Sequence, residues 1–479
     1  MEITVLGYLL IPLAVLLFIV KPDFLFYMMV FFSTFLAASV INIEPITFGL
    51  QPSYLFGMFW VIYLVFKYIR NPPAIDRKAK GCLLFLGLLW TVGLYSLNMP
   101  LVFKNRILVH GPSDLWGNKP LVLSISNFTQ FLYLTFVLLI AAFTMLEAND
   151  PVRIVRALKA LLASTAFAVV WGFFQLLCFY TGREYPYFLF NNSIGYAQLW
   201  NQTVGGIPRI NSIFPEPSAY SSVLLMVLPI VLVLWKKRVF LVRKAFLDLM
   251  LGGLFGTIIL TTSTTAYIGF AFMAVFIIAY FMFSRRAVQE PAVSGIRNKI
   301  AIREYFRVLS ITAALMAVVA IVLIAAFGMD IERFTALLRS MTIDKASSSS
   351  GMERGEGFFN GIRILRESWF LGVGWGSNRT FDLSTTLLSN TGVIGFTMFV
   401  VLFYKLLANC SRVYRNSDNY AFSSISLALL VSIATVLFIM FISGPDIILL
   451  CFWIEAGLAL SLREDNTSFR VNCLKGRCT

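Results

Sequence analysis

A charged, proline-containing stretch interrupts an otherwise hydrophobic chain at "RINSIFPEPS", Arg209 to Ser218. Its arginine and glutamate are side chains that suit the binding of anions and the transfer of protons. Pro215 and Pro217 disfavour a helix around Glu216, so the next hydrophobic helix is expected to begin near Ser218. A carboxylate placed there is stabilised by the helix dipole. The simpler interpretation is that Glu216 only caps this helix and that Arg209 extends toward lipid headgroups.

Three other stretches carry residue types that suit a binding site. "TTSTTAYIG" (261–269) is a hydroxyl-rich break between two hydrophobic segments, and its side chains can satisfy backbone groups freed at membrane depth. "GVGWGSNR" begins at Gly372 and brings Arg379 directly after three glycines. Glycine turns with exposed backbone N–H groups suit phosphate, although a glycine cluster alone is a weak indication. Arg354 follows a run of serines in "SSSSGMER".

Composition assigns these residues to a membrane protein. Of the 479 residues, 58% are hydrophobic and 13% are charged, whereas soluble proteins average about 25% charged residues. Many windows of about 18 residues carry no charge, and this is the length that a helix needs to cross a bilayer. The sequence therefore predicts an all-α fold, a polytopic transmembrane bundle in which residues 1–479 form one integral membrane domain.

Hydrophobic blocks predict about thirteen spans, at 3–20, 24–43, 50–69, 81–98, 125–146, 158–181, 218–235, 246–262, 265–283, 308–328, 386–407, 422–443 and 447–462. Of the 39 lysines and arginines, 27 fall on one alternate set of connections and 12 on the other. Because cytoplasmic loops are rich in these residues, the first set is predicted to be cytoplasmic. "RINSIFPEPS" then faces the outside, which in a bacterium is the periplasm. Topology thus explains the net charge of +15, and no nucleic acid is expected as a partner.

Three outer loops are long, and long loops tend to be functional: 99–124, 182–217 and 329–385. Basic residues are unexpected on this side, yet the last loop carries seven. Hydrophobic residues recur in it at helical spacing, so 354–370 is predicted to be an amphipathic helix that lies on or caps the core. Its predicted apolar face consists of Phe358, Ile362, Leu365 and Trp369, with Arg363 and Arg366 off that face. An interfacial helix that only packs is the alternative.

Metal and disulfide chemistry find little support in the sequence. His110 is the only histidine, which excludes a site that needs two imidazoles. The six cysteines are scattered, and "CLKGRC" at the tail has the wrong spacing for a CxxC site. We expect no metal and no cofactor.

The order of these motifs resembles the O-antigen polymerase and ligase family, the Wzy-like membrane glycosyltransferases. Among them it is most similar to the polymerases, in which a pattern like Arg209, Ser212, Phe214 and Glu216–Pro217–Ser218 is familiar. "TTSTTAYIG", "SGMER" and the glycine-rich stretch follow in order, with the large loop before the last. The resemblance implies a multi-pass enzyme of the bacterial inner (cytoplasmic) membrane with its active site facing the periplasm.

The resemblance also implies a reaction. A glycan on undecaprenyl pyrophosphate is transferred onto the sugar of another lipid-linked repeat unit of an O-antigen, capsule or exopolysaccharide, and undecaprenyl pyrophosphate leaves. Such enzymes use no nucleotide sugar and no essential metal, and the chain contains no Asp-x-Asp pair. Expected partners are the lipid-linked oligosaccharides, membrane lipid and a chain-length regulator protein.

By the same resemblance, Arg209, Arg354 and Arg379 are expected to bind the substrate pyrophosphate. Preorganised cations stabilise charge that develops on a leaving group, and losing one donor typically raises the barrier by about 3 kcal/mol. Arginine suits phosphate because its planar fork can bind two oxygens. Glu216 is the expected catalytic base, with Asp382 as the weaker choice. Two further candidates are Arg363 and Arg366.

Two alternatives stay open. Ligases of this family carry a histidine near the start of the span after the large loop, whereas "FDLSTTLLSNTG" here has none and His110 belongs to a different loop. A transporter or flippase of lipid-linked sugars would need ionisable residues at mid-membrane. Among acidic residues, only Asp248 and Glu455 fall inside predicted spans, and Asp248 lies near the end of its span.

Overall fold

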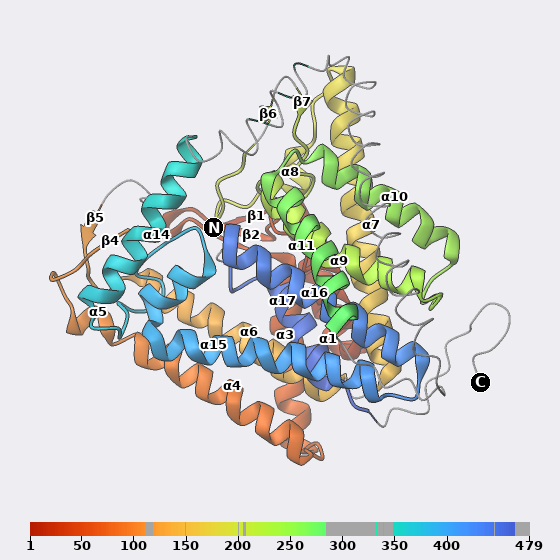
Figure 1. The fold of residues 1–479 in the computed structure, drawn as a ribbon, viewed down its shortest axis with the longest axis horizontal. Coiled ribbons are helices and arrows are strands. Elements are labelled where there is room, and N and C mark those ends of the chain that lie inside the picture. Colours follow the sequence, from red (N-terminus) through yellow and green to blue (C-terminus); the bar gives the residue numbers. More distant parts are fainter. Residues whose placement is uncertain are drawn as a thin grey trace.

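The computed structural model describes residues 1–110, 118–148, 150–199, 201–204, 207–283, 332, 335, 339, 348–444 and 446–464. Figure 1 shows helices packed against one another with only short strands among them. The helices are α1 (Val5–Val20), α2 (Pro22–Phe32), α3 (Pro52–Arg70), α4 (Arg77–Ser96), α5 (Met99–Val102), α6 (Ile125–Glu147), α7 (Pro151–Thr181), α8 (Tyr187–Phe190), α9 (Pro217–Lys236), α10 (Lys244–Leu260), α11 (Thr264–Phe283), α14 (Ser349–Glu367), α15 (Leu383–Asn416), α16 (Tyr420–Ser443) and α17 (Leu450–Ser461).

Three small antiparallel sheets accompany the helices, and none was expected from the sequence. They are β1–β2–β3 (Glu2–Ile3, Ile41–Ile43, Phe48–Leu50), β4–β5 (Leu108–His110, Asn118–Pro120) and β6–β7 (Thr203–Val204, Ile207–Pro208). The β6–β7 hairpin directly precedes Arg209, with Thr203 opposite Pro208. It therefore fixes where the "RINSIFPEPS" stretch begins.

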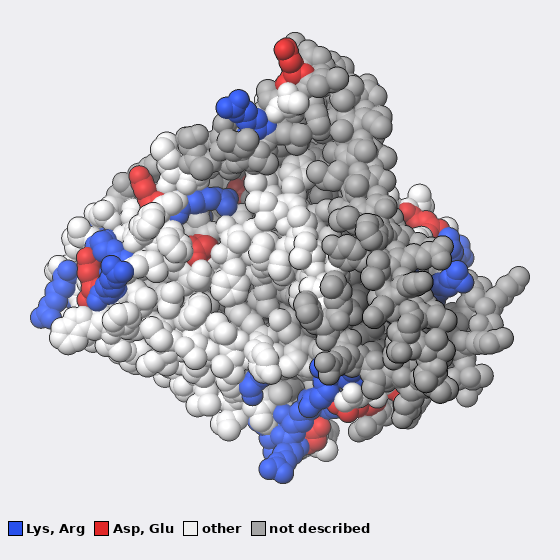
Figure 2. Space-filling model, viewed as in Figure 1, with Lys and Arg blue, Asp and Glu red and all other residues white. Residues whose placement is uncertain are grey.

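Among the residues that the structure describes, seven helices are long and apolar enough to cross a membrane, which supports the predicted membrane character in this coarser form. They are α3, α4 with α5, α6, α7, α9, α15 and α16, and four shorter apolar helices accompany them. Figure 2 shows a broad face with few charged side chains, as lipid contact requires. The count of about thirteen spans stays a prediction, and the predicted span 308–328 lies outside the described residues.

The predicted span 24–43 is wrong as a single helix. Helix α2 has 11 residues and ends at Phe32. Ser33 and Thr34 follow, and their hydroxyl groups bond to Val30 O at 2.7 Å and to Ser164 Oγ at 2.5 Å. The chain then becomes extended and pairs as β2 with both β1 and β3. Side-chain hydroxyls that compete for backbone partners end the helix although hydrophobic residues continue.

Helices α9 and α16 form the centre of the bundle. They are the most buried of the seven long apolar helices. Of the residues in their most hydrophobic 18-residue stretches, 72% in α9 and 83% in α16 are buried inside the protein. Ser432 Oγ in α16 donates to Met226 O in α9 at 2.6 Å. Because α9 begins at Pro217 and α16 ends at Ser443, both bring polar residues to one end of the bundle.

A buried carboxylate joins three helices at the opposite end. Glu147, the last residue of α6, has a side chain only 9% exposed. It accepts from Lys67 Nζ and from Tyr68 OH, both at 2.7 Å, and pairs with Arg153 at the start of α7. This cluster fastens α3, α6 and α7 together.

We predict that Glu147→Ala lowers the stability of the purified protein by about 1–3 kcal/mol, because two cations and a phenol lose their shared acceptor. Thermal unfolding in detergent measures the effect. The control is Asp248→Asn, which removes an exposed pair with Lys244 and should change stability by less than about 1 kcal/mol. Equal melting temperatures for the two variants would contradict the role of this cluster.

Candidate functional site

Two of the predicted arginines meet at the break between α10 and α11. Arg209 Nε donates to Thr261 O at 3.2 Å. Arg354 Nη1 donates to Ser443 Oγ at 2.9 Å, and that hydroxyl lies 2.6 Å from Thr265 Oγ1. Thr261 and Thr265 are the two ends of one short polar break, so side chains 145 positions apart in the sequence converge there. The predicted role of this hydroxyl-rich stretch as a helix break is confirmed.

Arg209 is a half-buried cation. Its backbone N–H donates to Gln202 O at 2.8 Å and its Nη1 to Gln202 Oε1 at 3.0 Å. Burial lowers the pKa of the Arg209 guanidinium, and the nearby charge of Glu216 opposes this shift. Among the described residues, Arg209 takes part in no salt bridge. Its guanidinium donates to oxygens of neutral groups, and the negative charge of Glu216 acts on it from a longer distance. Such a desolvated guanidinium favours an anionic ligand.

Glu216 occupies the N-cap position of α9 with extended backbone angles, so the helix begins at Pro217, one residue before the predicted start near Ser218. Its carboxylate makes no side-chain capping bond and instead accepts a short hydrogen bond from Ser218 Oγ. The residue is half-buried. Because its carboxylate makes no capping bond, the interpretation of Glu216 as a simple capping residue is weakened.

Gln175 in α7 fixes the backbone between Arg209 and Glu216. Its Oε1 accepts from Asn211 N at 3.0 Å and from Ser212 N at 2.8 Å, and its Nε2 donates to Asn211 Oδ1 at 2.6 Å. Ser212 has a φ of 51°, a left-handed conformation that is uncommon outside glycine. Gln175 stabilises this turn, and a lone glutamine within a hydrophobic span was the sequence signal for it.

Asp446 is a carboxylate that the sequence analysis missed. It lies between α16 and α17, three residues after Ser443, and is exposed to solvent. Surrounding protein nevertheless removes enough water to raise the pKa of Asp446, and Glu216 raises that pKa further while Arg379 lowers it. Glu216 and Arg379 thus both lie within electrostatic reach of Asp446. The only sequence signal was an acid after Gly-Pro at the end of a span.

Tyrosines line the same region. Burial raises the pKa of Tyr196, with Asp446 acting in the same direction and Arg379 against it. Gln51 Nε2 donates to Tyr196 OH at 3.4 Å, and Tyr54 OH donates to Ile448 O at 3.1 Å. These contacts bring the start of α3 to the α16–α17 connection.

The glycine-rich stretch before Arg379 serves packing, which corrects the expectation of exposed N–H groups for phosphate. A Cβ at Gly374 would lie 2.6 Å from Pro100, and one at Gly376 would lie 2.8 Å from Gln130. The backbone N–H groups of Gly374, Ser377 and Asn378 are all bonded to Asn390, at 2.9, 3.1 and 3.0 Å. The stretch therefore positions Arg379 through α15 and offers no free amide cradle at these residues.

His110 is not remote, contrary to expectation. Its backbone N–H donates to Asn378 Oδ1 at 3.1 Å and its carbonyl accepts from Arg379 N at 3.0 Å. Strand β4 is thereby joined to the segment that carries Arg379. Such pairing between distant loops leaves no local trace in the sequence.

Helix α14 confirms the predicted helix in the large loop, and the predicted apolar face is buried within the protein only in part, at Leu365. Phe358 and Trp369 are 42% and 79% exposed. The helix packs instead through Gly357 and Gly361, where a Cβ would meet Phe381 at 3.0 Å and Thr385 at 2.7 Å. Small residues allow close approach to α15, and this contact outweighs the burial of aromatic rings.

The three weaker candidates lie elsewhere or are otherwise engaged. Asp382 is the N-cap of α15 and accepts from Thr385 N at 2.8 Å and Ser384 Oγ at 2.5 Å, so it stabilises a helix end. Arg363 pairs with Glu367 at 3.0 Å and donates to Leu108 O at 2.8 Å. Arg363 lies nine residues after Arg354, about 13 Å along the helix. Arg366 is exposed on the outward side of α14.

We predict that Gln175→Met lowers the free energy of unfolding by about 1–3 kcal/mol for each backbone N–H left without its acceptor. The protein should therefore unfold at a lower temperature. Thermal unfolding in detergent is the measurement. Thr181→Val in the same helix removes an exposed hydroxyl and should change stability by no more than about 0.5 kcal/mol. If Gln175→Met melts like Thr181→Val, the turn does not depend on this amide.

Comparisons with protein-family models, with curated proteins and with solved structures find no match to this chain. The family resemblance carried by the four motifs therefore stays a prediction. Function has to be argued from the residues gathered around the α10–α11 break and the α16–α17 connection.

Proposed function

We propose that the protein is a membrane glycosyltransferase that polymerises oligosaccharide repeat units linked to a polyprenyl diphosphate. The repeat units would belong to an O-antigen, capsule or exopolysaccharide, and the site would face the periplasm of a bacterial inner membrane. The observation that carries the proposal is the convergence of Arg209 and Arg354 on one polar break. Glu216 lies within electrostatic reach of both Arg209 and Asp446, and Asp446 is also within reach of Arg379.

The proposed step is a glycosyl transfer. A hydroxyl oxygen of the acceptor sugar forms a bond to C1 of the donor sugar, and the bond between C1 and the phosphate oxygen breaks. The lipid diphosphate leaves with the electron pair, and the hydroxyl proton passes to a carboxylate. The leaving group thus gains negative charge, which preorganised guanidinium groups stabilise more in the transition state than in the ground state.

Arg209 and Arg354 suit this task because neutral groups hold them. A backbone carbonyl and an amide oxygen orient Arg209, and a serine hydroxyl orients Arg354. Neither contact cancels the positive charge, so both guanidinium groups keep it for a ligand. Each guanidinium can offer two parallel N–H groups to phosphate oxygens. Arg379 is proposed to bind the same diphosphate from the side of Asp446.

Glu216 is the proposed base, and Asp446 becomes a second candidate. A carboxyl with a raised pKa is a stronger base once it has lost its proton, and catalysis favours groups whose pKa approaches the working pH. The raised pKa of Asp446 therefore counts in its favour. Asp382 is dropped, because its carboxylate caps α15.

Ligase-type transfer is the second candidate function, and one observation favours it. The backbone of His110 is bonded to Asn378 and Arg379, so this loop reaches the proposed site after all. Product length separates the two activities, since a ligase performs a single transfer whereas a polymerase yields a series of chain lengths.

We predict that the purified protein, incubated with lipid-linked repeat units, yields a ladder of glycans on a gel. Arg209→Ala and Arg354→Ala should each lower the rate about 10²–10³-fold, the usual effect of losing one donor at a developing anion. Arg415→Ala, an exposed arginine at the other end of the bundle, is the control and should leave the ladder unchanged. A product no longer than one transfer would reject polymerisation, and full activity in either site variant would reject the paired arginines.

We also predict opposite shifts of the Asp446 pKa in two variants. Glu216→Gln removes a negative charge and should lower that pKa, whereas Arg379→Gln removes a positive charge and should raise it. Infrared difference spectra across a pH series, assigned with Asp446→Asn, follow the carboxyl group directly and need no turnover. An unchanged pKa in both variants would show that these three residues do not share a site.

A further inference from the structure

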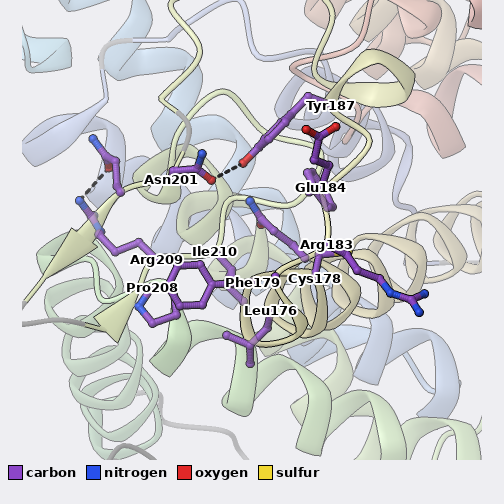
Figure 3. A pocket seen from close by; sticks show the side chains of 14 residues that line it. Leu176, Cys178, Phe179, Arg183, Glu184, Tyr187, Asn201, Pro208, Arg209 and Ile210 are labelled. Carbon is purple, nitrogen blue, oxygen red and sulfur yellow. Dashed lines mark hydrogen bonds between the residues drawn. The ribbon is translucent and has the colours of Figure 1, made fainter.

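A pocket of about 510 Å³ opens beside Arg209, in the range typical of small-molecule sites. Its walls are the carboxyl-terminal end of α7, the segment 182–187 that follows it, and the residues on either side of the β6–β7 hairpin. Figure 3 shows Arg209 at one side of this pocket, with Tyr187 and Asn201 at another. Nothing in the proposed transfer step has yet used this space.

The lining combines aromatic rings with amide groups. The rings of Tyr185 and Tyr187 meet edge to face with centroids 4.7 Å apart. Tyr187 OH donates to Asn201 Oδ1 at 3.0 Å, and Gln202 Oε1 accepts from Arg209. Phe179 adds an apolar surface on the side of α7.

We propose that this pocket binds a sugar ring of the acceptor glycan, an inference that rests on the proposed function. A pyranose has an apolar face, which stacks on aromatic rings, and a rim of hydroxyl groups, which bond to amides and to tyrosine hydroxyls. Tyr187 supplies the ring, while Asn201 and Gln202 supply the amides. The pocket matches both parts of such a ligand.

Other parts of the substrate fit this pocket less well. Glu184 and Arg183 are both exposed at the rim, so their opposite charges offset one another and this edge gives a diphosphate no net attraction. A polyprenyl tail would cover the side-chain NH₂ groups of Asn201 and Gln202 without offering them an acceptor, which is unfavourable. A largely neutral, hydroxyl-rich ligand meets neither difficulty.

Arg209 connects the pocket to the transfer site. It lines the pocket and also donates to Thr261 O at the α10–α11 break. A sugar held against Tyr187 therefore lies on one side of the guanidinium, and the diphosphate proposed for the break lies on the other. This arrangement places an acceptor hydroxyl next to the donor C1, which is the proximity that transfer requires.

Direct binding tests the pocket without turnover. The probe is the free oligosaccharide released by mild acid from the lipid-linked repeat units of the source cell, so it carries no diphosphate and no lipid. Saturation-transfer NMR with the full-length protein should show transfer to its ring protons. Tyr187→Ala and Asn201→Ala should each weaken binding about tenfold or more, while thermal unfolding confirms that the variants are folded. Tyr187→Phe, which keeps the ring, should retain more binding than Tyr187→Ala.

Phe188→Ala is the matched control, because Phe188 lies in the same helix α8, is 63% exposed and does not line the pocket. It should bind the oligosaccharide as the unaltered protein does. Absence of saturation transfer, or equal binding by folded Tyr187→Ala and Asn201→Ala, would overturn the proposal. Binding without a glycan ladder would keep the sugar pocket and reject polymerisation, whereas a ladder without binding would reject the pocket alone.

Discussion

A guanidinium held within the protein by neutral oxygens is the interaction on which the proposed site depends. Arg209 is bonded to Thr261 O and Gln202 Oε1, and its charge is met by Glu216 only across a gap. A cation that has lost water without gaining a contacting anion binds anionic ligands well. Keeping it there requires a rigid surround, which the Gln175 contacts with Asn211 and Ser212 provide. Loosening that surround would let the arginine turn toward water or headgroups.

The bundle brings the remaining groups to the same end. Helices α9, α11, α15 and α17 all begin there, and α10 and α16 end there, so each contributes a terminus rather than a mid-helix residue. Termini and the breaks between helices tolerate polar and charged groups that the hydrocarbon core excludes. The opposite end holds Glu147, whose carboxylate is bonded to both Lys67 and Arg153. That cluster joins helices, whereas Arg209 at the other end has no contacting carboxylate among the described residues.

Prediction from sequence succeeded where local chemistry decides the structure. The start of α9 within one or two residues of Ser218, the break at Thr261 and a helix around Arg354 all follow from prolines, hydroxyls and spacing nearby. Prediction failed where contacts between segments distant in the sequence determine the structure. Asp446 and His110 join the site only through the packing of other loops, and the sequence shows no spacing that links them to Arg379.

Two departures from the predictions share one physical cause. The aromatic spacing in α14 suggested one buried apolar face, yet Gly357 and Gly361 let the helix approach α15 more closely through its small side. The glycines before Arg379 suggested an amide cradle for phosphate, yet the N–H groups of Gly374, Ser377 and Asn378 are bonded to Asn390. Glycine permits a close approach of backbone, and the sequence does not reveal whether a ligand or another helix makes that approach.

The central claim is that Arg209 and Arg354 bind one diphosphate together, and its most direct test is the affinity of the purified protein for a short, soluble polyprenyl diphosphate. Calorimetric titration of the unaltered protein, both single alanine variants and the double variant gives the coupling between the two side chains. The account predicts that each single substitution weakens binding about tenfold or more. The double variant should lose less binding free energy than the two single losses added together, since the two contacts serve one ligand. Equal affinity across all four proteins would contradict it.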